Sequence, residues 1–146
     1  MRRTFLTLAL IAMPLGLAPA LAQHDGHEGH SETKGLPGLF VAQGETWFFK
    51  IKDGQPADAR KGSADKKPGS DEIRVSLDGD SMLVLNGSTT AFNYQAFIAK
   101  KPSDKGSRTS VCTLIPGALM HEIWPGKLPG IRLANFEEAI EEYGCF

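Results

Sequence analysis

The segment EIRVSLDGDSMLVLN, residues 72–86, decides the fold class of this 146-residue chain. Ile73, Val75 and Leu77 alternate with polar residues, which is the pattern of a β-strand with one buried face. The Asp-Gly pair that follows supplies the positive backbone φ of a tight turn, and the apolar run SMLVLN suits a central strand. The segment therefore predicts a β-hairpin within an antiparallel sheet.

Similar strand patterns recur on both sides of this hairpin. Short apolar or alternating runs are separated by turn residues, at intervals of about 8–12 residues. The predicted strands are residues 39–42, 45–52, 72–77, 81–86, 91–100 and 109–115. Residues 119–124 have room for a short strand or an extended run, and residues 131–136 could add one more strand. Strands of this number and spacing predict an all-β fold, with an immunoglobulin-like antiparallel β-sandwich as first choice and a small barrel as the alternative. Trp47 and Trp124 are expected in its core or at its rim.

Two segments depart from the strand pattern. Residues 53–71 show no apolar period and are rich in Gly, Pro, Ser and charge, so we predict a long mobile loop. Near the C-terminus, Phe136 begins an apolar series that continues at 139, 140 and 143, which is the spacing of one helical face. Asn135 can cap this segment, which predicts a short C-terminal helix.

Cys112 and Cys145 are the only cysteines, and we predict that they form a disulfide. The bridge would close a loop of about 34 residues and stabilise the fold by roughly 3.5–4 kcal/mol. A redox pair or a thiolate metal site is the alternative, but the chain has no C-x-x-C motif.

The first residues predict export. Arg2 and Arg3 precede an apolar run, and Ala20 and Ala22 stand at −3 and −1 of a cleavage site, as in a Sec-type signal peptide. We therefore expect residues 1–22 to be removed after Ala22 and the protein to be periplasmic or secreted, without membrane insertion. Residues 23–38 are expected to form a disordered, histidine-containing leader, followed by one domain, residues 39–146.

The charge balance excludes one class of partner. Without Arg2 and Arg3, the count of basic residues falls from 16 to 14, against 17 acidic residues. A nucleic-acid-binding protein normally shows a basic surplus, so we expect no nucleic-acid partner.

Two groups of side chains suggest metal binding. In QHDGHEGH, His24, His27 and His30 recur at a spacing of three, and imidazoles in a flexible chain can converge on copper or zinc. Met120 and His121 form a weaker candidate pair, because adjacent residues of a strand point to opposite faces. A hydrophilic leader and a lone histidine at a sheet rim are the alternative interpretations.

The chain carries no specific catalytic motif, so we do not expect an enzyme. The favoured interpretation is an exported binding protein with a disulfide-stapled β-sandwich, whose partner is an envelope protein or a small ligand. In that case, exposed apolar surface near Trp124 would be important for binding. The alternative is a periplasmic protein that binds or delivers copper or zinc through the histidine leader. Small periplasmic copper carriers built on β-sandwiches are similar in size and compartment, but no residue motif is shared.

Overall fold

The computed structural model of the chain describes residues 36–140 and 143–146. The predicted hairpin is present: β4 (Ile73–Asp78) pairs with β5 (Ser81–Asn86), and Asp78 lies opposite Ser81 across the turn. Gly79 has φ 60°, the left-handed conformation that the turn requires. Ile73, Val75 and Leu77 are all buried, as their alternation predicts.

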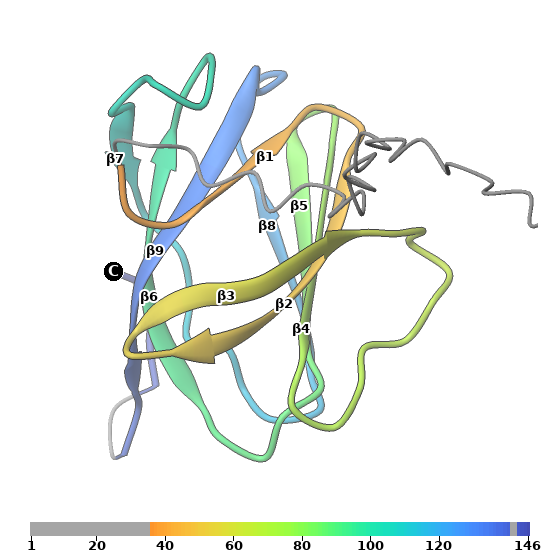
Figure 1. Cartoon of the computed structure of the whole chain (residues 1–146). Coiled ribbons are helices and arrows are strands. Elements are labelled where there is room, and N and C mark those ends of the chain that lie inside the picture. The colour runs from red at the N-terminus through yellow and green to blue at the C-terminus, as the bar shows by residue number, and fades with distance from the viewer. Residues whose placement is uncertain (1–35, 141–142) are drawn as a thin grey trace, which may run out of the picture.

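Nine strands in the described residues form two antiparallel sheets (Figure 1). One sheet has the order β3-β2-β4-β5-β8, in which β2 is Thr46–Lys52, β3 is Gln55–Lys61 and β8 is Leu119–Ile123. The other has the order β1-β9-β6-β7, in which β1 is Leu39–Ala42, β6 is Phe92–Ile98, β7 is Ser107–Thr109 and β9 is Gly130–Glu138. The prediction of an all-β fold is confirmed.

A single hydrophobic core lies between the two sheets. Both sheets contribute alternating side chains to it, so the arrangement is that of a β-sandwich. The buried members of the core are Val41, Phe49, Ile73, Val75, Leu77, Met82, Val84, Tyr94, Ala96, Val111, Leu114, Leu128, Ile131, Leu133 and Phe136. Trp47 and Trp124 pack against it from its rim, where the sequence places them.

The immunoglobulin-like topology is not confirmed. Four consecutive strands, β2 to β5, lie in one sheet here. In an immunoglobulin domain the third strand already crosses to the second sheet, so no four consecutive strands share a sheet.

The prediction of a loop over residues 53–71 is wrong for its first half. The chain turns at Asp53 and Gly54, which both have positive φ, and β3 then pairs with β2. β3 is a sheet edge with little area to bury, so residues 55–61 carry few apolar side chains. The sequence therefore shows no apolar alternation here from which a strand could be predicted. The remainder, residues 62–71, contains no strand and covers the outer face of β4, where Arg74 donates to the carbonyls of Ala64 (2.5 Å) and Lys66 (2.8 Å).

No helix is found near the C-terminus in the part of the chain that the structure describes, and residues 141–142 lie outside it. β9 continues as a strand through Phe136 to Glu138. A bulge in β9, with Asn135 at φ 52°, shifts the alternation by one residue and turns Phe136 inward, where it stacks on Tyr94. The helix prediction assumed that Phe136 and Ile140 share one buried face. Phe136 is instead buried through the bulge in β9, and Ile140 is 80% exposed.

Candidate functional site: the free edge of strand β8

The metal-binding candidates do not converge in the described structure. Along β8, Met120 turns inward and packs against the core, whereas His121 turns outward and is exposed. Residues 36–140 and 143–146 hold no group of three or more His, Cys, Asp or Glu side chains that can bind a metal ion. His24, His27 and His30 lie outside these residues, so the copper or zinc leader stays a prediction.

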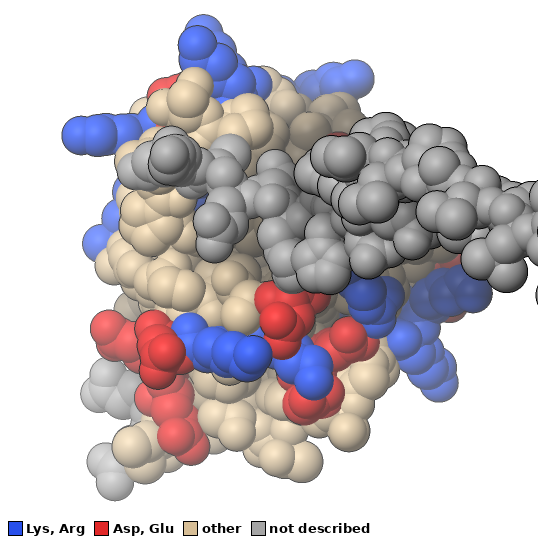
Figure 2. Space-filling model, in the orientation of Figure 1, with Lys and Arg blue, Asp and Glu red and all other residues tan. Residues whose placement is uncertain are grey.

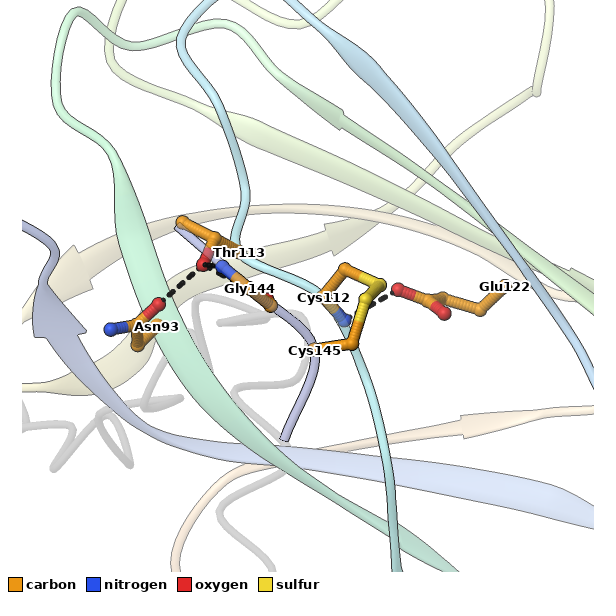
Figure 3. The surroundings of a disulfide bond; sticks show 6 residues. All are labelled: Asn93, Cys112, Thr113, Glu122, Gly144 and Cys145. Atoms are coloured by element: carbon orange, nitrogen blue, oxygen red, sulfur yellow. Dashed lines mark hydrogen bonds between the residues drawn. A yellow bond between two sulfur atoms is a disulfide. The ribbon is translucent and has the colours of Figure 1, made fainter. Parts of the chain in front are cut away.

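The predicted disulfide between Cys112 and Cys145 is present (Figure 3). Val111 and Phe146 exchange two backbone hydrogen bonds (3.0 and 3.1 Å) on one side of the bridge, and Thr113 donates to the Gly144 carbonyl (2.8 Å) on the other. The two cysteines therefore face each other at a non-hydrogen-bonded position of a short antiparallel ladder, where the two backbones lie closest. The expected continuous strand over 109–115 is wrong, because the chain forms only isolated bridges beyond β7.

The inward face of β8 is anchored to the same segment. The Glu122 carboxylate accepts the backbone N–H of Cys112 at 2.7 Å, and the Trp124 indole donates to the Thr109 hydroxyl at 2.6 Å. Figure 3 shows Glu122 extending toward the bridge. Burial, and then the charge of Glu122, raise the pKa of the Tyr94 hydroxyl well above its ordinary value, so it stays neutral. These contacts fix β8 at the side of the sandwich.

The outward face of β8 is apolar and exposed. Leu119 is 52% exposed and Ile123 is 65% exposed, with His121 between them. Leu83 and Leu85 of β5 lie across from His121 and Leu119 and are half-buried. We refer to Leu83, Leu85, Leu119 and Ile123 as the apolar row. Isolated exposed leucines are common on proteins, but adjacent ones on two paired strands indicate an interaction surface.

The backbone of β8 has one unpaired side. Asn86 donates its N–H to the Ala118 carbonyl (3.2 Å), and Trp124 donates its N–H to the Asp80 carbonyl (2.9 Å). The register between these two bonds assigns the N–H and C=O groups of Met120 and Glu122 to β5, whereas the Ala118 N–H donates to the Ile115 carbonyl. The N–H and C=O groups of Leu119, His121 and Ile123 therefore point away from β5. They make no backbone hydrogen bond to any residue that the structure describes.

The other three sheet edges are protected in different ways. β3 carries Pro56 and a bulge with Asp58 at φ 52°, and its charged side chains form ion pairs with neighbouring residues. These pairs are Lys52–Asp58, Arg60–Glu72 and Lys61–Glu45, and Figure 2 shows the alternating charges on this face. β7 has only three residues, and the four residues of β1 are buried or half-buried. Charge, proline, bulges and short length are the usual protections of a strand edge, and β8 has none of them.

The sequence predicts exposed apolar surface near Trp124, and the structure places two exposed aliphatic side chains there. Trp124 is half-buried and serves as an anchor, whereas the exposed surface near it comes from Leu119 and Ile123. The run PGALMHEIWPG contains the signal that was available in the sequence, because two Pro-Gly pairs bracket a short apolar strand. Which three residues of that strand have unpaired backbone groups depends on its register with β5, and this needs the structure.

No helix among the described residues has the length and apolar character needed to cross a membrane. Comparison with protein-family models, with curated proteins and with solved structures gave no significant match, so the geometry of the chain itself carries the functional conclusion.

Proposed function

We propose that this protein is an exported, non-catalytic binding protein that pairs an extended segment of another protein chain along β8. The observation that carries the proposal is the set of unpaired backbone N–H and C=O groups at Leu119, His121 and Ile123, bordered by the apolar row. Addition of a strand to a sheet edge is an established mode of peptide recognition. Its main-chain hydrogen bonds provide affinity, and alternate side chains provide specificity.

The anchoring of β8 supports this role. A strand that receives a partner must hold its position without one, and Glu122 and Trp124 fasten the inward face of β8 to the segment that carries the disulfide. The edge is therefore organised before binding, which lowers the entropic cost of association.

The disulfide supports the proposed compartment. A disulfide is more typical of an exported protein, because cytosolic thiols are kept reduced. The signal-peptide pattern of residues 1–22 points the same way, and we propose an envelope protein as the partner because it shares that compartment.

Site-specific photo-cross-linking in cells tests the proposal. A photoreactive amino acid is placed at Leu119 or Ile123, and at Lys52, the last residue of β2 and the ion-pair partner of Asp58 in β3, as a matched control. We expect discrete protein adducts from the two β8 positions and none from Lys52. The absence of adducts at β8, or equal adducts at all three positions, would contradict the proposal.

A further inference from the structure

We infer that the chain paired with β8 is a second copy of this protein, joined antiparallel about a two-fold axis through His121. This inference rests on the proposed function and names the partner of the same edge. It predicts a continuous sheet in which the two β8 strands are central and the order outward in each copy is β5, β4, β2 and β3.

The register of β8 with its own copy satisfies every unpaired backbone group of the strand. A two-fold axis at His121 places His121 opposite itself and Leu119 opposite Ile123 of the other copy. These are the three residues whose N–H and C=O groups point away from β5. Directly opposed residues of this kind exchange two hydrogen bonds in an antiparallel pair, so none of the six groups in either copy is left over.

The side chains on the outward face are also self-complementary. Leu119 meets Ile123 of the other copy on either side of the axis, so the apolar rows of the two molecules join into one surface. Aliphatic pairs directly across an antiparallel ladder stabilise it. The exposed fractions of Leu119 and Ile123 would fall together on pairing.

No like charges oppose this arrangement. The outward residues of β8 include no Lys, Arg, Asp or Glu, and Glu122, the one acidic residue of the strand, turns inward to the Cys112 N–H. A two-fold axis at the centre of β3, the other edge of the same sheet, would place Asp58 opposite itself and the proline Pro56 within the new pair. Charge therefore selects β8 over β3 for self-association.

A five-residue strand makes a small interface, so the dimer is expected to be weak and dependent on concentration. Sedimentation equilibrium of the purified protein over a wide concentration range measures its dissociation constant. His121→Glu and His121→Lys each place two like charges across the axis, and each variant is expected to weaken the dimer by at least about tenfold.

Mixing the two variants provides the decisive test. A heterodimer of His121→Glu with His121→Lys places opposite charges across the axis, so the mixture should dimerise at least as strongly as the unaltered protein, while each variant alone stays monomeric. Thr89→Glu and Thr89→Lys serve as the matched control pair, because Thr89 is exposed on a turn outside β8, and mixing them should change nothing. Both sets must retain the circular dichroism spectrum of the unaltered protein.

A second variant tests the backbone contribution. Ile123→Pro removes an N–H that points away from β5, so the native ladder is kept while one bond in each copy of the pair is lost. Loss of dimer with retained folding supports the inference. A protein that stays monomeric at all concentrations, or a mixture of the charged variants that does not associate, overturns it. If β8 in such a monomer still cross-links to a different protein, the proposed function stands and only the identity of the partner is wrong.

Discussion

The contribution of a side chain to the free energy of unfolding depends in this fold on which face of its strand it occupies. Leu133 of β9 and Leu119 of β8 are the same residue type in regular strands, yet Leu133 is fully buried between the sheets and Leu119 is 52% exposed. The free energy of unfolding follows the apolar area removed from water and the cavity left behind.

We expect Leu133→Ala to lower the free energy of unfolding by about 2–5 kcal/mol, and Leu119→Ala to lower it by less than about 1 kcal/mol. Urea denaturation of dilute protein measures both. A large loss for Leu119→Ala in the monomer would mean that this side chain supports the fold and is not a free binding surface.

Asn86 is a buried polar residue that joins β5 to two neighbouring segments. Its amide nitrogen donates to the carbonyls of Thr90 (2.8 Å) and Leu114 (3.2 Å), and its side-chain oxygen accepts from Ser88. Asn86→Ala removes these bonds, although the Leu114 carbonyl keeps the Phe92 N–H and the Thr90 carbonyl keeps the Ser88 hydroxyl, and we expect a loss of about 1–3 kcal/mol in unfolding free energy. Thr89→Ala, at an exposed position of the same turn, is the control and should be nearly neutral.

The ion-paired loop beside β4 makes stability depend on pH through Glu72. The hydrogen bond from the Gly69 N–H, together with the ion pair to Arg60, lowers the pKa of Glu72 below its ordinary value of 4.5. A carboxyl with a lowered pKa in the folded state stabilises the fold above its unfolded pKa. That contribution is lost as the pH falls through the folded pKa.

We therefore expect the urea midpoint of the unaltered protein to fall below about pH 4.5 more steeply than that of Glu72→Gln. Glu138→Gln, on the exposed end of β9, is the matched control and should keep the steep fall. Equal pH profiles for Glu72→Gln and the unaltered protein would show that this carboxylate does not support the loop.

At the level of strands and loops, the sequence predicted elements wherever a strand buries one complete face. The hairpin of β4 and β5 and the inward residues of β6 follow a strict two-residue period, and the structure confirms them. Predictions were wrong where the period is interrupted. β3 is a polar edge with a bulge, and β9 shifts its alternation at Asn135, so that Phe136 fits a helical spacing by coincidence.

The candidate site was likewise predicted only in part from the sequence. The sequence identified the disulfide, because two cysteines allow only one pairing, and the exposed region near Trp124, because an apolar run is a local signal. It did not identify the unpaired backbone groups of β8, because these depend on which strand lies beside β8 and in which register. Long-range pairing of this kind leaves no mark within a short window of sequence.

For the molecule as a whole, the disulfide joins the C-terminal segment to the segment between β7 and β8. Cys112 and Cys145 are 33 residues apart, and the chain-entropy estimate for a loop of this length is roughly 3.5–4 kcal/mol. The bridge also holds the segment that anchors β8 through Glu122.

We expect a double Cys112→Ser, Cys145→Ser variant to melt more than about 10 °C below the oxidised protein. Treatment of the unaltered protein with a reductant should lower its melting temperature by a similar amount, and the reductant should leave the double variant unchanged. An unaltered melting temperature on reduction would contradict a stabilising role for the bridge.

The central claim, that β8 offers an unpaired strand edge to a second chain, is tested most directly by amide hydrogen exchange along residues 118–124, followed by NMR at low and at high protein concentration. We expect the amides of Met120, Glu122 and Trp124 to be protected at both concentrations, because β5 and the adjacent Asp80 carbonyl accept their hydrogen bonds. The amides of Leu119, His121 and Ile123 should exchange rapidly in dilute protein and become protected as the concentration rises. Protection of these three amides in dilute protein would contradict the claim. Rapid exchange at every concentration would overturn the inference that the second chain is another copy of this protein.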